Sequence, residues 1–241
     1  MQWKRISALS FGALLAASLC ACSYKQIEDG LRGTAQGSKE LTEDELAQNE
    51  MIEKVEALAT EEFEDKVYRI GDTVTWTDYS GGRIQYTLKE VRTGNNIGDF
   101  GVSIDDFTNT SKAYISESGD ALGNGTGTYI FVEADVEVEN INYEGFYGAD
   151  FEPYSLYAET SIKSQSELDD SEGVPHNMEA VYFSHHAEEE QKYFFYHLEP
   201  GQTAEVQLIW IVPETDMQEP LYYVVGAANS KELQQFFQMN D

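Results

Sequence analysis

Residues 130–139 constrain the fold more than any other stretch, because apolar and acidic side chains alternate along them. The apolar positions are Ile130, Val132, Ala134, Val136 and Val138, and those between them are Phe131, Glu133, Asp135, Glu137 and Glu139. This period of two predicts a β-strand that buries its apolar face and turns the four carboxylates toward water. We expect lysines of a neighbouring strand to pair with the carboxylates. A flat strand does not wrap the roughly six to eight oxygen ligands of Ca²⁺ around an ion.

Short runs of strand-like composition recur in the rest of the chain, separated by turn-forming residues and without helical runs between them. The expected strands cover residues 67–70, 73–77, 84–91, 178–183, 193–198, 204–212 and 221–227. Residues 78–82 predict a hairpin turn between the second and third of these strands. The pattern is typical of a mainly β protein, and it predicts an antiparallel β-sandwich over residues 65–241.

Three segments are expected to lie outside the sheets. Residues 41–64 predict an acidic amphipathic helix, because apolar side chains recur there at helical spacing and Thr42 and Glu45 form a capping-box pattern. This helix either packs on the sandwich or stands as a stalk. Residues 94–127 are expected to form an irregular loop with one or two short strands. Residues 231–239 are expected to form a short helix whose apolar face holds Leu233, Phe236 and Phe237.

The first 22 residues predict a lipoprotein signal, with a basic start and an apolar run shorter than the about 20 residues of a membrane-spanning helix. Leu19-Cys20-Ala21-Cys22 resembles the bacterial lipobox, which implies cleavage after Ala21 and a diacylglyceryl group on Cys22. We expect a signal peptide at residues 1–21 and a flexible tether at residues 22–40. The protein would then be anchored in the lipid bilayer, at the extracytoplasmic face of the bacterial cytoplasmic membrane. The alternatives are an unlipidated secretory signal and a membrane-spanning segment.

The chain is strongly acidic, with 44 Asp and Glu residues against 15 Lys and Arg residues and a net charge of −29. Such a surface repels nucleic acid phosphates, which excludes DNA and RNA as partners. It favours cations, cationic peptides or basic protein surfaces, although high net charge also simply keeps exported proteins soluble. The two cysteines are Cys20 and Cys22, so cleavage and lipidation would leave no thiol for a disulfide or a metal site.

No catalytic motif is present, since the chain lacks a nucleophile elbow, a zinc-binding His-Glu-x-x-His pair, a phosphate-binding loop and a dinucleotide fingerprint. We therefore predict no catalytic residue and no cofactor. The best candidate for ligand binding is the aromatic-rich segment 141–175. Its rings either form a platform for a sugar or peptide, or plug the open end of the sandwich. The candidate residues are Tyr143, Phe146, Tyr147, Phe151 and Tyr154.

Calcium is the cation with the best sequence candidates, because its ligands are carboxylate and carbonyl oxygens and acidic pairs lie in two loops. These candidates are Asp105, Asp106, Asp169, Asp170 and Glu172, and none of them belongs to an EF-hand pattern. His185 and His186, followed by the acidic run 188–190, either offer ligands to a transition metal or form an exposed polar loop.

Three landmarks carry a resemblance to a known family. They are Gly71-Asp72-Thr73-Val74, a long strand that ends near Asn140, and Glu199-Pro200-Gly201-Gln202-Thr203 before a strand that ends at Val212-Pro213. The pattern resembles the uncharacterised immunoglobulin-like lipoproteins of Gram-positive bacteria, which carry domains of unknown function. The resemblance covers roughly residues 67–227 and implies an immunoglobulin-like β-sandwich with no established catalytic residues. The segments 94–127 and 141–175 are longer than the family's compact form, so specific binding is expected there.

We therefore expect a surface lipoprotein with a non-enzymatic binding or interaction role at the cell envelope. A membrane-protein complex or a cationic peptide would be its partner. The alternatives are a cell-envelope hydrolase that uses clustered carboxylates, and a small solute-binding lipoprotein. The second alternative is disfavoured because such receptors alternate strands with helices, and this sequence does not.

Overall fold

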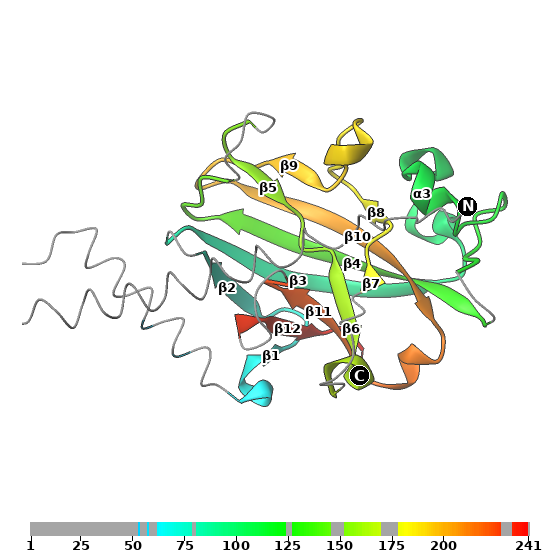
Figure 1. Cartoon of the computed structure of the whole chain (residues 1–241), viewed down its shortest axis with the longest axis horizontal. Helices are drawn as coiled ribbons and strands as arrows, with labels where there is room; N and C mark the ends of the chain where they lie inside the picture. Colours follow the sequence, from blue (N-terminus) through cyan, green and yellow to red (C-terminus); the bar gives the residue numbers. More distant parts are fainter. Residues whose placement is uncertain are drawn as a thin grey trace, which may run out of the picture. The chain divides into compact units, whose positions relative to one another are not determined.

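The described residues fold as a β-sandwich of two five-stranded sheets with a two-stranded ribbon beside them (Figure 1). The computed structural model describes residues 53, 57, 62–78, 81–123, 127–145, 152–169, 178–227 and 233–240. The β4 sheet contains, in spatial order, β2 (Thr73–Thr77), β3 (Arg83–Gly94), β4 (Tyr129–Asn140), β10 (Thr203–Pro213) and β8 (Tyr182–Phe183). The β11 sheet contains β1 (Val67–Tyr68), β12 (Gln235–Gln238), β11 (Leu221–Val225), β6 (Ser161–Ser164) and β7 (Met178–Glu179). The ribbon pairs β5 (Ser155–Tyr157) with β9 (Phe195–His197).

The order of the strands is that of an immunoglobulin-like domain. In such domains strands A, B, E and D form one sheet, and strands C, F and G form the other. Here β3, β4, β10 and β8 take the places of A, B, E and D, while β6, β11 and β12 take those of C, F and G. Strands β2, β7 and β1 extend the edges, and β1 pairs with β12 in parallel, unlike the other pairs. The expected immunoglobulin-like sandwich is therefore confirmed.

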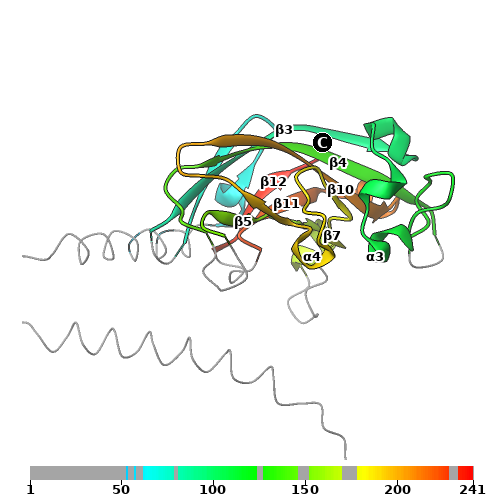
Figure 2. The ribbon, with the colours of Figure 1, turned by 90° about the horizontal axis from the view of Figure 1, so that it is seen from above.

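The main core lies between the two sheets, which Figure 2 shows as two layers. The predicted inward positions of β4 supply much of it: Val132, Ala134 and Val136 have no exposed surface, and Val138 is 2% exposed. Trp210 of β10 is also fully buried, and its Nε1 donates a hydrogen bond to the carbonyl oxygen of Thr160 at 2.7 Å. The bond satisfies the one polar atom of this side chain and ties β10 to the start of β6.

The opposite face of β4 is only partly exposed to solvent, which corrects the prediction of a solvated row of carboxylates. Glu133 has no exposed surface, and Arg92 of β3 and Gln207 of β10 donate hydrogen bonds to its carboxylate. The expected lysine pairing is seen in the described part of the chain between Lys89 and Glu137 at 3.1 Å. A buried carboxylate needs such partners, since an unpaired charge would not be tolerated there.

Residues 95–123 cover this outer face and build a second core, where we expected an irregular loop. They form η2 (Ile97–Phe100), η3 (Ile104–Asp106) and α3 (Asn109–Lys112), and the two β-bridges here are isolated pairs. Each short helix begins at a residue whose side chain caps backbone N–H groups, as Asn, Ser and Thr favour. The buried members of this second cluster are Ile97, Phe100, Phe107, Ile115, Phe131, Tyr182 and Ile209.

The predicted C-terminal helix is wrong, because residues 235–238 form β12 between β1 and β11. Phe236 and Phe237 point to opposite sides of this strand, with Phe237 in the main core and Phe236 against Leu168 and Tyr222. The predicted strand 178–183 is also two strands, since β7 and β8 belong to different sheets. Pairing with distant strands outweighed the local pattern in both cases.

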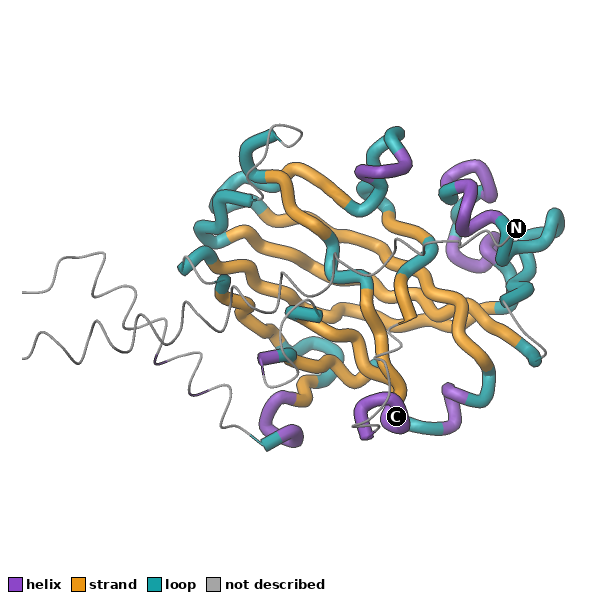
Figure 3. Tube along the Cα trace, viewed as in Figure 1, coloured by secondary structure: helices purple, strands orange, loops and turns teal. Residues whose placement is uncertain are grey.

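The described helices after residue 62 are short and lie around the strands (Figure 3). Besides those above they are η1 (Phe63–Lys66), α4 (Gln165–Asp169), η4 (Glu190–Lys192) and η5 (Asp216–Gln218). Glu53 and Ala57 are helical; the other residues before position 62, which include most of the helix predicted for residues 41–64 and Cys22, lie outside the described ones. In the described part of the chain, no helix is long and apolar enough to cross a membrane.

Candidate functional site

A cavity of about 490 Å³ lies between the two sheets and the β5–β9 ribbon. Trp76 of β2 and Tyr86 of β3 line it from the β4 sheet, and Ser161 of β6 and Glu179 of β7 line it from the β11 sheet. Most of its other lining residues are aromatic or aliphatic. A cavity of this size and lining is typical of small-molecule sites, which hold a few polar groups in an apolar wall.

Glu159 is the carboxylate that two backbone N–H groups orient in this cavity. Its Oε1 accepts a hydrogen bond from the N–H of Gly226 at 3.0 Å, and its Oε2 accepts one from Ala227 at 3.3 Å. Gly226 follows the last residue of β11 with φ +75°, a left-handed conformation that suits glycine. The turn thereby directs two successive N–H groups at one carboxylate, as anion-binding turns do.

The surroundings of Glu159 disfavour its charge. Burial raises the pKa of its carboxyl to about 7, although the two N–H groups act in the opposite direction and nearby Glu179 adds a smaller increase. Among the described residues, Glu159 makes no salt bridge with a basic side chain. Glu159 is therefore poised to change charge near neutral pH, a property that is common at functional sites.

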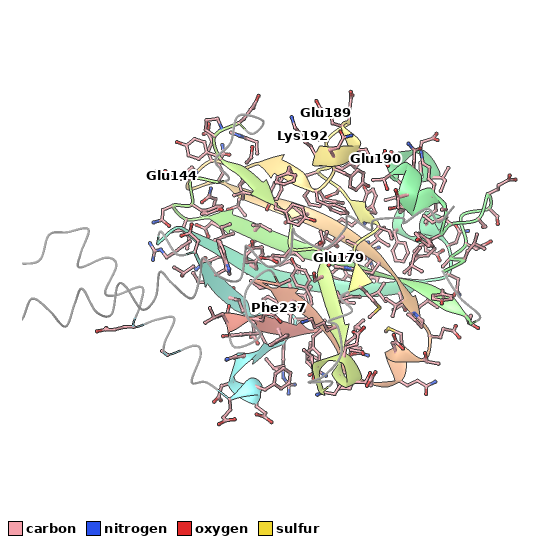
Figure 4. The ribbon with its side chains drawn as sticks, in the orientation of Figure 1. Glu144, Glu179, Glu189, Glu190, Lys192 and Phe237 are labelled. Atoms are coloured by element: carbon pink, nitrogen blue, oxygen red, sulfur yellow. The ribbon has the colours of Figure 1, made fainter. Side chains whose placement is uncertain are left out.

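Glu179, labelled in Figure 4, is the second carboxylate of the cavity, and hydroxyl groups hold it. Thr160 Oγ1 donates to its Oε2, and Ser161 Oγ donates to its Oε1 at 2.8 Å. These bonds join β7 to the start of β6 and leave Glu159 as the carboxylate without a side-chain donor among the described residues.

Two pairs of aromatic rings form much of the wall. Trp76 and Tyr143 meet edge to face with ring centroids 5.5 Å apart, and Tyr157 and Phe194 do so at 6.2 Å. The Trp76 Nε1 atom is buried and has no hydrogen-bond partner among the described residues. A buried indole usually finds a partner for this N–H group, so the Trp76 N–H group is an exception among the described residues.

Asn140, at the end of β4, holds the backbone of Tyr143 in place. Its Oδ1 accepts a hydrogen bond from the N–H of Tyr143 at 2.7 Å, and its Nδ2 donates to the carbonyl oxygens of Tyr143 and Leu198 at 2.9 and 2.7 Å. Asn140 has no exposed surface. This buried amide therefore fixes the start of the aromatic-rich segment against the turn between β9 and β10.

The structure places the aromatic residues that the sequence predicts for ligand binding in different surroundings. Tyr143 lines the cavity, whereas Tyr154 packs edge to face on His197 and has a positive φ of 62°. Phe146, Tyr147 and Phe151 lie outside the described residues. Sequence reasoning missed Glu159 because acidic residues are abundant, and missed Trp76 because it lies on a strand that pairs regularly.

The predicted calcium ligands that the structure describes either make local structural contacts or are exposed to solvent. Asp106 caps η3 by accepting a hydrogen bond from the N–H of Ser103 at 2.9 Å, and Asp105 is exposed. Asp169 ends α4, and Asp170 and Glu172 lie outside the described residues. Over the described ranges, no group of three or more His, Cys, Asp or Glu residues is placed to hold a metal ion.

The histidine and acidic segment makes structural contacts instead of gathering into a site. His186 stacks on Tyr193 with ring centroids 4.7 Å apart. Glu190 lies on η4 beside Glu189 and Lys192 (Figure 4), and its Oε1 accepts a hydrogen bond from the N–H of Asn109 at 3.0 Å. The bond between Asn109 and Glu190 joins η4 to α3.

Comparison with known proteins gives a family without an assigned activity. No curated protein matches the sequence. A crystal structure of an uncharacterised β-sandwich protein from Clostridium difficile 630 is similar at 12% identity and a TM-score of 0.35, covering 75% of this chain and 98% of that one. Residues 65–240 match the model of the family described as "Domain of unknown function (DUF5027)". Since this match spans most of the chain, the protein belongs to the DUF5027 family.

Proposed function

We propose that this chain is a lipid-anchored binding protein of the bacterial cell envelope, with the cavity between its sheets as the ligand site. The observation that carries the proposal is the cavity of about 490 Å³, which combines aromatic walls with the oriented carboxylate of Glu159. Such a volume is within the range of small-molecule sites. The immunoglobulin-like fold itself argues for no particular activity, since function resides in sites.

The anchor in this proposal is a diacylglyceryl group on Cys22, which rests on the lipobox-like sequence. Two acyl chains hold a protein stably on a bilayer, and the tether at residues 22–40 would carry the sandwich at the extracytoplasmic face of the cytoplasmic membrane. Removing residues 1–21 takes away two basic residues and no acidic one, so the net charge changes from −29 to −31. A membrane-protein complex or a cationic peptide is the macromolecular partner that this charge favours.

A second candidate function is a cell-envelope hydrolase, because the carboxylates of Glu159 and Glu179 line the same cavity. A carboxyl with a pKa near 7 suits general acid catalysis. The hydroxyl groups of Thr160 and Ser161 occupy the oxygens of Glu179, which favours a structural role for that residue. The binding role therefore ranks first.

Native mass spectrometry of full-length protein purified from cells tests the binding role. We expect adducts of small molecules on the wild type that Ala227→Trp abolishes, because this side chain lines the cavity and the substitution fills it. Ala227→Ser is the matched control and should keep the adducts. Identical spectra for the wild type and Ala227→Trp would contradict the binding role, whereas turnover of cell-wall material that is lost in Glu159→Gln would favour the hydrolase.

The anchor is tested separately. Metabolic labelling with a palmitate analogue should mark the wild type, and Cys22→Ala should carry no label and leave the membrane fraction. Labelling of the Cys22→Ala variant would show that a residue other than Cys22 carries the lipid. Crosslinking in cells then compares the two forms, and a protein partner that requires the anchor should appear with the wild type alone.

A further inference from the structure

The cavity contains a carboxylate that has no cationic partner among the described residues. Glu159 is hydrogen-bonded to the N–H groups of Gly226 and Ala227, and the salt bridges among the described residues all lie elsewhere. Within the described part of the chain each of its oxygens accepts one N–H bond and keeps a further lone pair, since a carboxylate oxygen has about two acceptor sites. Placing an ionised carboxylate in such surroundings without a counter-charge is costly.

The other groups near Glu159 do not supply that counter-charge. Among the described residues they are Tyr86 of β3, Tyr157 of β5, Tyr196 of β9, Tyr223 of β11 and Glu179 of β7. Burial raises the pKa of the four tyrosines, so they stay neutral at physiological pH. The remaining carboxylate adds negative potential. The local field therefore favours a positively charged group in the cavity.

The aromatic walls suit the same kind of ligand. The rings of Trp76, Tyr143, Tyr157 and Phe194 line the cavity beside the carboxylate. Aromatic faces attract ammonium groups through the ring quadrupole, and they also pack against an apolar body. Ca²⁺ is a poorer match, because it requires roughly six to eight oxygen ligands, and the two carboxylates here are set in a mostly apolar wall.

We propose that the cavity binds an organic ammonium cation, with its charged group against the Glu159 carboxylate and its apolar body between the aromatic rings. This inference rests on the proposed binding function and assigns it a ligand class. The oriented carboxylate confers the preference for charge, and the rings confer affinity for the body of the ligand. Since the cation binds the ionised carboxylate, ligand affinity depends on the fraction of Glu159 that is deprotonated.

Isothermal titration calorimetry on the full-length protein tests the inference with two probes of similar shape, 2-phenylethylammonium and neutral 2-phenylethanol. We expect the ammonium probe to bind at least tenfold more tightly than the alcohol at pH 8. Glu159→Gln should remove this preference while keeping the alcohol affinity, because the shape of the cavity is unchanged. Glu205→Gln, an equal charge change at an exposed position of β10, should leave both affinities unchanged.

The pH dependence provides a test that needs no variant. With the pKa of Glu159 at about 7, roughly one tenth of the carboxylates is ionised at pH 6 and nine tenths at pH 8. The affinity of the wild type for the ammonium probe should therefore rise about tenfold between these pH values, and that for the alcohol should stay constant. CaCl₂ at millimolar concentration should not displace the ammonium probe.

The outcomes separate the two proposals. Equal affinities for both probes, abolished by Ala227→Trp, would overturn the preference for cations and leave the binding function standing. Displacement of the probe by CaCl₂ would assign the carboxylate to metal ions and overturn the organic ligand class. If neither probe binds, and the native mass spectra of the wild type and Ala227→Trp are also identical, both proposals fail.

Discussion

Arg92 donates two parallel hydrogen bonds to the carboxylate of Glu133, 2.7 Å from Nε to Oε2 and 2.6 Å from Nη2 to Oε1. Glu133 is fully buried, whereas 40% of the Arg92 side chain is exposed. The pair therefore lies at the boundary between the outer face of the β4 sheet and the second core, where Arg92 also stacks over the ring of Phe100. Bidentate geometry of this kind is the strongest form of a salt bridge.

The first prediction follows from this pair. Arg92→Met should lower the free energy of unfolding by about 3 kcal/mol, because it leaves a buried carboxylate with Gln207 as its remaining side-chain donor. Lys89→Met on the same strand is the matched control. Its partner Glu137 is 35% exposed, so the loss should stay below about 1 kcal/mol. Urea denaturation measures both, and equal losses would show that burial of Glu133 does not determine the energy.

The pair of Arg92 and Glu133 also shows which features of β4 the sequence predicts and which it does not. The alternation along β4 was sufficient to predict the buried positions of Val132, Val136 and Val138, because they depend on the period of the strand alone. The burial of Glu133 depends on Arg92 and Gln207, which lie 41 and 74 residues away along the chain. Local periodicity carries no information about such partners.

The candidate site was less predictable than the fold for a related reason. Tyr143 was identified from the density of aromatic residues around it, but Glu159 gains its properties from the turn after β11, 67 residues further on. The helix expected at residues 231–239 failed in the same manner. Phe236 and Phe237 have a spacing that suits several structures, and pairing with β1 and β11 decides between them.

The second prediction concerns Glu159 and pH. Its pKa is about 7 in the folded protein against an ordinary value of 4.5, so between these pH values the folded state binds more protons than the unfolded state. The free energy of unfolding therefore falls as pH rises through this window, by about 3 kcal/mol in total. Glu159→Gln removes this contribution. The free energy of unfolding of the variant, relative to that of the wild type, should therefore increase by about 3 kcal/mol between pH 4.5 and pH 8. Urea denaturation at several pH values measures the difference, and parallel curves would contradict the assignment.

The third prediction concerns the approach of Gly82 to the ring of Tyr143. A Cβ atom at Gly82 would lie 2.5 Å from Tyr143 Cδ2, so Gly82→Ala must displace the ring and disturb its contact with Trp76. We expect a loss of stability of about 1–3 kcal/mol, as for other overpacked sites, and a change in tryptophan fluorescence. Gly127→Ala is the control, because its nearest contact would be an ordinary 3.9 Å. An unchanged emission spectrum in Gly82→Ala would show that the Tyr143 ring is not held against Trp76.

The fourth prediction concerns the central strand. Val136 has no exposed surface, and on β4 it lies between Leu88 of β3 and Val206 of β10. Val136→Asp would place a carboxylate in the main core without a donor, which is too costly for a domain whose total stability is about 5–15 kcal/mol. We expect this variant to lose cooperative thermal unfolding. Glu139→Asp, which keeps the acid on the other face of the same strand, should melt like the wild type. A sharp transition in Val136→Asp would mean that the core can admit water at β4, and that the alternation along residues 130–139 does not determine the sandwich.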